Sequence, residues 1–177
     1  TGITTLFVTH DQEEAMSISD FIVVMKDGVL MQQGAPQQVY DDPACLFVAK
    51  FLGTPPINVF AGEVQSGALL LAGQKALPVP GAPDGEVWVG VRPEGFVPAA
   101  GGPLACALNR VEVLGRDTSI VCTHPALQGD TVRAIVRPEE LTGPMGDTVR
   151  FALKPEKVFL FDRGTEQRIR FGGAARA

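Results

Sequence analysis

The sequence predicts a short mixed α/β segment over residues 1–53, followed by a small all-β barrel or sandwich over residues 54–177. Two observations carry this division. Up to Gly53, apolar strand-like runs alternate with helix-like patterns, whereas beyond it short β-like runs are separated by Gly, Pro and Asp. Between the two regimes stands Pro55–Pro56, which cannot continue a helix and favours extended backbone. No pattern after about Gly53 predicts a helix.

The first segment opens on a run, Thr4–Thr9, that is apolar or β-branched on both faces. Such a run predicts a strand inside a parallel sheet, with neighbours on both sides. The sequence supplies no earlier βα units to provide them. We therefore expect the chain to be the tail of a longer protein.

A helix and a hairpin follow this run. Asp11, with Glu14 three residues later, predicts a capped helix start. The apolar run Phe21–Met25 and the run "VLMQQG" flank Asp27–Gly28, a pair that tolerates the positive φ of a tight two-residue turn. The sequence thus predicts a β-hairpin here.

Two short helices close the α/β segment. The first begins at Pro36, because proline suits the first helical position. For the second, Asp42 is the predicted N-cap, Pro43 the first residue and Gly53 the terminator. One apolar face at helical spacing is expected, formed by Phe47, Val48, Phe51 and Leu52.

Composition narrows the class of protein. The formal net charge of −5 and the lack of a basic cluster argue against a nucleic-acid partner. The three cysteines (Cys45, Cys106 and Cys122) are far apart, which favours reduced thiols over disulfides or a zinc site. No apolar run approaches the roughly 20 residues that span a bilayer, and no signal peptide is visible. The sequence therefore predicts a cytosolic chain. His10 and Glu14 have the i, i+4 spacing of two metal ligands on a helix, but no third ligand stands at a suitable spacing, so no metal site is predicted.

The first third of the chain resembles a known family. The motifs "VTHDQEEAM", "DGVLMQQGAP" and "FVAKFLGTPPIN" closely resemble the end of the nucleotide-binding domain in ABC-transporter ATPases. The branch is the one that serves importers of maltose, glycerol phosphate, polyamines, sulfate and ferric iron. Later, "VGVRPE" and "LGRDTSIV" resemble that branch's C-terminal TOBE domain, an OB-like barrel. The resemblance implies the end of a P-loop ATPase domain over residues 1–53 and a TOBE-type regulatory domain over 54–177.

By this resemblance His10 is the switch-loop histidine, which contacts the γ-phosphate and helps to position the attacking water. The resemblance implies ATP and Mg as cofactors of the full-length protein. The chain departs from the family in lacking the phosphate loop G-x-x-x-x-G-K-[ST], the signature motif and the acidic pair that holds magnesium. We therefore expect this chain alone to bind no cofactor and to be inactive as an enzyme.

The resemblance also implies partners and a location. Two subunits would form a homodimer, working with transmembrane permease subunits and a substrate-binding protein. They would lie in the cytoplasm, peripheral to the inner face of the cell membrane. The closing "KVFLFDRGTEQRI" looks most like the carbohydrate and glycerol-phosphate branch, so the expected cargo is a sugar or glycerol phosphate.

A weakly repeated sequence pattern in residues 54–177 leaves two interpretations open. "VGVRPEGF", "AIVRPEEL" and "FALKPEKV" each end a strand in a basic residue followed by Pro-Glu. In the first interpretation, Pro-Glu serves only as a strand-ending turn. Alternatively, the basic residues Arg92, Arg137 and Lys154 form a regulatory anion surface. The missing phosphate loop also leaves open an alternative function, a stand-alone TOBE-like sensor of small oxyanions without ATPase activity, which the intact "VTHDQEEA" motif opposes.

Overall fold

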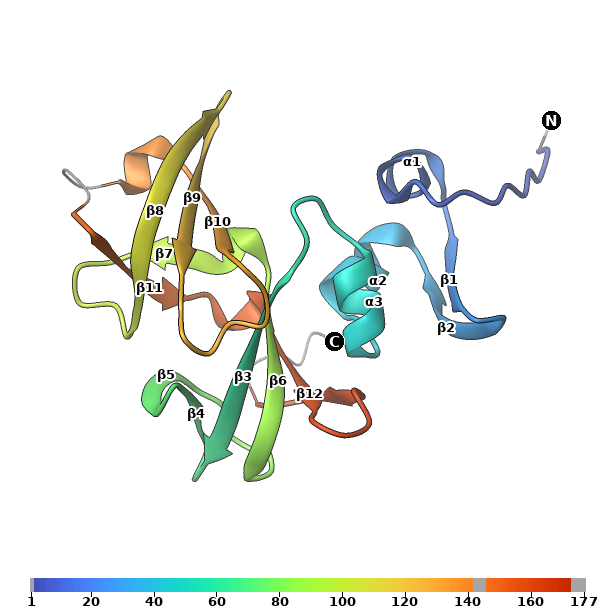
Figure 1. Ribbon diagram of the computed structural model, residues 1–177. Helices are drawn as coiled ribbons and strands as arrows, with labels where there is room; N and C mark the ends of the chain where they lie inside the picture. The colour runs from blue at the N-terminus through green and yellow to red at the C-terminus, as the bar shows by residue number, and fades with distance from the viewer. Residues whose placement is uncertain (1, 142–145, 173–177) are drawn as a thin grey trace.

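A computed structural model describes residues 2–141 and 146–172 of the chain. A hairpin and a first helix lie at one end of the molecule, two β-sheets lie at the other, and two short helices lie between them (Figure 1). The two sheets together make a nearly closed, OB-like barrel. The predicted fold class, an α/β piece followed by an all-β barrel, is confirmed.

The α/β piece contains three helices and one hairpin in its described residues. Their bounds are α1 Gln12–Ile18, β1 Ile22–Lys26, β2 Val29–Gly34, α2 Pro36–Asp41 and α3 Leu46–Phe51. The hairpin turn is the predicted one, with φ of 50° at Asp27 and 79° at Gly28. Helix α2 begins at Pro36, as its sequence predicts.

The predicted strand Thr4–Thr9 is wrong for this structure. Residues 2–9 carry no strand assignment, and the side chains of Ile3, Leu6 and Val8 are 83%, 90% and 96% exposed. A strand is held by hydrogen bonds to neighbouring strands, and the described residues offer this run none. The apolar side chains of this run are therefore exposed, although their pattern predicts that they are buried.

The start of α3 also differs from the prediction. Its N-cap is Cys45, not Asp42, and the helix begins at Leu46 rather than at Pro43. Asp42 is instead the C-cap of α2, and both its carboxylate oxygens accept hydrogen bonds from Arg170 at 2.8 and 2.9 Å. The Asp42 side chain, which the local sequence predicts as a helix cap, therefore forms an ion pair with a distant residue instead.

Helix α3 buries two faces rather than the single predicted one. Val48 and Leu52 pack with the hairpin residues Ile22 and Val24. On the opposite side, Leu46 and Ala49 belong to a separate cluster against the barrel, completed by Ile57, Val59, Phe159 and Phe161. Phe51, which the helical pattern places in the core, is 42% exposed. The helix is therefore the apolar link between the hairpin and the barrel.

The barrel is built from two antiparallel sheets. One has the strand order β13-β12-β6-β3-β4-β5 and the other β10-β9-β8-β11-β7. The first sheet comprises β3 Asn58–Gln65, β4 Ala68–Leu71, β5 Gln74–Pro78, β6 Gly85–Val91, β12 Val158–Asp162 and β13 Arg168–Ile169. The second comprises β7 Phe96–Pro98, β8 Leu104–Leu114, β9 Asp117–Thr123, β10 Val132–Val136 and β11 Thr148–Leu153. Three 3₁₀ turns interrupt the strands: η1 Pro93–Gly95, η2 Pro138–Glu140 and η3 Pro155–Lys157.

The main core lies between the two sheets. Phe60 of β3 packs on Phe96 of β7 with ring centroids 6.5 Å apart, and Phe96 packs edge-on against Phe151 of β11 at 5.3 Å. All three rings are fully buried. Cys106 and Cys122 lie in the same core and Cys45 lies in the hairpin cluster, and all three are buried free thiols.

One buried amide joins the two sheets. Asn58 of β3 donates from Nδ2 to the carbonyls of Val91 and Arg133 at 3.2 and 2.9 Å, and its Oδ1 accepts from the Arg133 amide at 2.8 Å. Asn58 is 6% exposed, so water cannot replace these bonds at full strength.

We predict that Asn58→Ala lowers the free energy of unfolding by about 3 kcal/mol, because it leaves both backbone polar groups of Arg133 without this partner. Urea denaturation measures this change. The matched control is Asn109→Ala, since Asn109 is exposed at the bulge of β8, and it should change stability by less than about 0.5 kcal/mol. Equal effects of the two substitutions would contradict the role of Asn58.

Candidate functional site

His10 is presented by a locally fixed backbone. It directly precedes Asp11, the N-cap of α1, whose Oδ1 accepts from the amides of Glu13 and Glu14 at 2.9 and 3.0 Å. On its other side, the Thr9 hydroxyl oxygen accepts from the Asp11 amide at 3.0 Å. The His10 side chain is exposed, so its imidazole is free to meet a ligand.

The predicted capping pair is thus half confirmed. Asp11 caps the helix, but the Glu14 carboxylate does not return to the Asp11 amide. The Glu14 carboxylate instead accepts a hydrogen bond from the Thr9 hydroxyl at 3.1 Å. The oxygen of the same hydroxyl accepts the hydrogen bond of the Asp11 amide. The backbone on both sides of His10 is therefore held by side chains from within residues 9–14.

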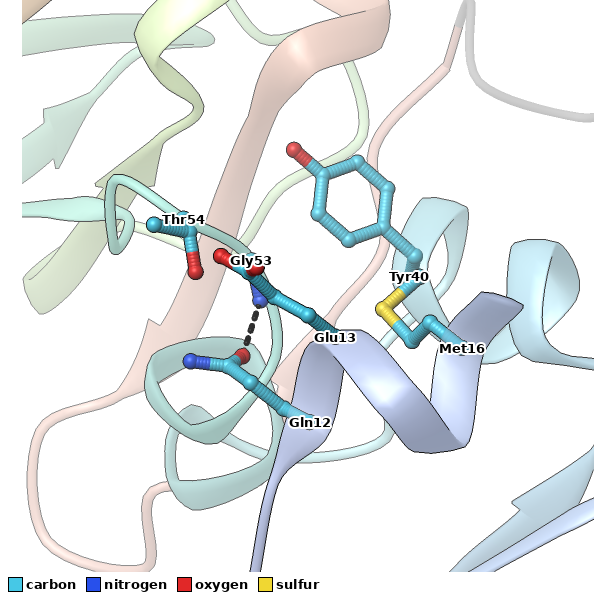
Figure 2. A pocket seen from close by; sticks show the side chains of 6 residues that line it. All are labelled: Gln12, Glu13, Met16, Tyr40, Gly53 and Thr54. Atoms are coloured by element: carbon cyan, nitrogen blue, oxygen red, sulfur yellow. Dashed lines mark hydrogen bonds between the residues drawn. The ribbon is translucent and has the colours of Figure 1, made fainter. Parts of the chain in front are cut away.

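A pocket of about 320 Å³ lies between α1 and the segment that enters the barrel. Figure 2 shows the Gln12 side chain reaching the backbone of Gly53, whose amide donates to Gln12 Oε1 at 2.6 Å. The pocket is lined by Gln12, Glu13, Met16, Tyr40, Gly53 and Thr54. This hydrogen bond connects the helix that follows His10 to the end of α3.

Arg92, at the end of β6, holds α2 and α3 on the barrel. The side chain is fully buried. Its Nη1 donates to the carbonyls of Ala49 and Leu52 at 3.0 and 2.5 Å, and its Nη2 donates to the carbonyl of Tyr40 at 2.9 Å. These carbonyls belong to the last turns of the two helices, where backbone acceptors lack helical partners and carry partial negative charge. The guanidinium supplies both the donors and the positive charge that they need.

The Tyr40 ring packs on this guanidinium, with 3.8 Å between the Arg92 Cζ and the ring centroid. The Tyr40 hydroxyl donates to Glu94 Oε1 at 3.2 Å. Burial raises the pKa of Tyr40, the positive charge of Arg92 opposes this, and Glu94 adds to the rise, which brings the pKa to about 12. Burial also lowers the pKa of Arg92, although an arginine stays charged at physiological pH.

Lys157 completes the charged edge of this junction. Its Nζ lies 3.2 Å from Asp41 Oδ1 and 3.1 Å from Glu94 Oε1. Burial lowers the pKa of Lys157, but the interactions with Glu94 and Asp41 outweigh it, and the pKa is raised above its ordinary value. The junction therefore combines a buried cation with a half-exposed ion-pair network.

The three basic residues of the repeated turns have different environments. Each precedes a 3₁₀ turn that begins with proline, as their shared sequence pattern indicates. Two of the turns exchange backbone bonds, Arg92 N to Lys157 O at 3.0 Å and Lys154 N to Gly95 O at 2.8 Å. Arg92 is buried, so it is not available to a surface ligand. Arg137 is exposed, and Lys154 Nζ donates to the Glu94 carbonyl at 3.0 Å.

The structure brings together residues that sequence patterns did not connect. Arg92 was predicted as an anion-binding residue, but it binds backbone carbonyls. Gln12 and Tyr40 carry no motif signal of their own, and Gly53 is predicted only as a helix terminator. Their roles depend on contacts between segments about 40 residues apart, which no local pattern encodes. Among residues 2–141 and 146–172, no cluster of three or more metal-ligating side chains is found.

We predict that Tyr40, the only tyrosine of the sequence, titrates in the folded chain at about pH 12, against about 10 when unfolded. The unfolded state therefore loses its proton first, and the stability contributed by this residue falls as the pH rises through 10 to 12. Absorbance of the phenolate measures both titrations, with and without urea.

Glu94→Gln should lower the folded midpoint, because it removes a negative charge next to the hydroxyl. The control is Glu86→Gln, an exposed glutamate of β6, which should leave the midpoint unchanged. A folded midpoint near 10 would show that Tyr40 is not buried as described.

Comparisons with known proteins agree with this architecture. The family model of the TOBE domain matches residues 89–161, from within β6 to within β12. The sn-glycerol-3-phosphate import ATP-binding protein UgpC of Ruegeria pomeroyi is 34% identical over 169 residues, which are 95% of this chain and 47% of that protein. The sulfoquinovosyl glycerol transport ATP-binding protein SmoE of Agrobacterium fabrum is 36% identical over 178 residues, 95% of this chain and 49% of its own.

A further relative is the lactose transport ATP-binding protein LacK of Rhizobium radiobacter, 39% identical over 184 positions that cover 94% of this chain and 49% of LacK. The chain spans about half the length of these curated relatives. Within the part of the chain that the structure describes, every helix is too short or too polar to cross a bilayer. By these matches the chain carries a TOBE domain and corresponds to the C-terminal part of ABC-importer ATP-binding subunits.

Proposed function

We propose that this chain is the C-terminal portion of the ATP-hydrolysing subunit of an ABC importer, with His10 as its switch histidine. Residues 1–53 end the nucleotide-binding domain in this proposal, and residues 54–177 form the regulatory TOBE domain. The observation that carries it is the presentation of His10, an exposed imidazole on a fixed backbone, in a chain 34–39% identical to import ATP-binding proteins.

The described residues do not by themselves fit ATP or Mg. They hold no cluster of metal-ligating side chains, and their first helix already gives the amides of Glu13 and Glu14 to Asp11. The phosphate-binding and magnesium-binding groups would come from the part of the relatives that this chain does not span. The imidazole of His10 is suited to donate a hydrogen bond to a phosphoryl oxygen and to orient a water molecule. Charge that develops on the transferring group would be stabilised by this contact.

The cargo class follows from the relatives' names, which specify sn-glycerol-3-phosphate, sulfoquinovosyl glycerol and lactose. We extend this to the present chain as a carbohydrate or a glycerol phosphate. The partners in this proposal are two permease subunits and a substrate-binding protein, with the ATPase peripheral at the inner face of the membrane. Arg137 and Lys154 remain candidates for a regulatory anion contact, whereas Arg92 is committed to the helix ends.

The first step of the test is to sequence the source gene upstream of the Thr1 codon. An in-frame phosphate loop, signature motif and acidic pair would give a longer protein for assay. In that protein we predict that His10→Ala lowers ATP turnover by at least about 100-fold, while ATP affinity changes by less than about threefold.

The matched control is His124→Gln, which replaces the only other histidine of the sequence. His124 accepts from the Ala126 amide at 3.1 Å in a loop of the barrel, so its replacement should leave turnover near wild type. Wild-type turnover in His10→Ala would remove the role given to His10. A gene that starts at or just before Thr1 would contradict the ATPase proposal and favour a stand-alone sensor of small oxyanions.

We also propose that the isolated 177-residue chain forms a homodimer, because several large apolar side chains are exposed near its start, among them Leu6 at 90% and Val8 at 96%. Light scattering at high micromolar concentration should give twice the monomer mass of 18.8 kDa. Leu6→Asp should weaken the dimer. Val113→Asp, on an exposed part of β8, is the matched substitution on a different face. A strictly monomeric wild-type chain would contradict the proposal.

A further inference from the structure

A single peptide unit is bound from both sides, by the helix that follows His10 and by the barrel. The carbonyl of Leu52 and the amide of Gly53 belong to one planar peptide group. Gln12 of α1 accepts from the Gly53 amide at 2.6 Å (Figure 2). Arg92 of the barrel donates to the Leu52 carbonyl at 2.5 Å. The two partners lie 80 residues apart in the sequence and meet through this one rigid group.

The peptide unit has little room to turn independently of its two partners. Gly53 has φ of +112°, a conformation that a residue with a side chain rarely adopts. A Cβ at this position would lie 2.8 Å from Cε2 of Tyr40 and 3.3 Å from Nη1 of Arg92. On the other side, Val48 of α3 and its C-cap Leu52 are buried against the hairpin. A rotation of the plane therefore disturbs the bonds to Gln12 and Arg92 together.

We propose that the Leu52–Gly53 peptide couples the barrel to α1, so that a displacement of the Arg92 turn changes the position of α1 and of His10. Arg92 lies directly before η1, and η1 contacts η3. At this contact the side chains of Lys157 and Glu94, both partly exposed, form an ion pair. A ligand or partner of the barrel that shifts η1 would displace the Leu52–Gly53 peptide through its hydrogen bond to Arg92. The coupling is reciprocal, so a change at α1 also alters the surroundings of Arg92 and Tyr40.

This inference rests on the proposed function only for its consequence at His10. The coupling itself is a property of the 177-residue chain, and it is measurable without nucleotide. The tests below therefore succeed or fail independently of ATP turnover in His10→Ala.

The first test is amide hydrogen exchange by NMR in Arg92→Lys. A lysine keeps the positive charge but cannot span the carbonyls of both α2 and α3. We expect exchange of the Gly53 amide and of the α1 amides to rise at least about tenfold, with the amide of Ile120 in the barrel core unchanged. The matched control is Arg137→Lys, because Arg137 occupies the same turn motif but is exposed. Unchanged Gly53 and α1 exchange in Arg92→Lys, or a rise equal to that of Ile120, would overturn the coupling.

The second test runs in the opposite direction and does not depend on the folding of Arg92→Lys. Gln12→Met keeps the length of the side chain but removes the acceptor, whereas Gln12→Glu retains one. Gln12→Met should raise the exchange rate of the Gly53 amide, and Gln12→Glu should leave this amide protected. If the peptide transmits the change, Gln12→Met also lowers the titration midpoint of Tyr40 from about 12 towards its unfolded value, because the ring loses part of its packing. A midpoint equal to that of the wild type would show that α1 and the Arg92 cluster are independent.

Discussion

The structure depends on the burial of one guanidinium. Arg92 carries a charge that the protein cannot neutralise, so its removal from water requires strong acceptors. The carbonyl ends of α2 and α3 provide them for its two terminal nitrogens, and the face of the Tyr40 ring covers the cation, whereas Nε is buried without a hydrogen-bond partner. Separation of these helices from the barrel would leave both the charge and the helix ends unpaired, which fixes their relative position.

The helices that the sequence assigns to the α/β segment thus belong energetically to the barrel as well. Helix α3 buries one face against the hairpin and the other against Phe159 and Phe161 of β12. Polar contacts act in the same direction, since Arg170 pairs with Asp42 through two hydrogen bonds. The change in composition near Gly53 is therefore a change of secondary structure and not a flexible boundary.

His10 contrasts with this junction. The backbone around it is held by the side chains of Thr9 and Asp11, and the His10 side chain faces solvent. Such an arrangement keeps the imidazole accessible while the neighbouring helix stays in register. The hydrogen bond between Gln12 and Gly53 is where this local arrangement meets the barrel.

The sequence by itself determined the features that depend on neighbouring residues. These are the Asp27–Gly28 hairpin, the start of α2 at Pro36, the Asp11 cap and the strands of the barrel with their proline turns. Its motifs also indicated the family.

Only the tertiary structure decided which of several local options each residue took. Thr4–Thr9 has the pattern of a buried strand but no strand beside it among the described residues, and Asp42 pairs with Arg170 instead of capping α3. Arg92 has the sequence context of Arg137 but a buried environment. Burial and pairing depend on which distant segments come into contact, and a local pattern does not contain that information.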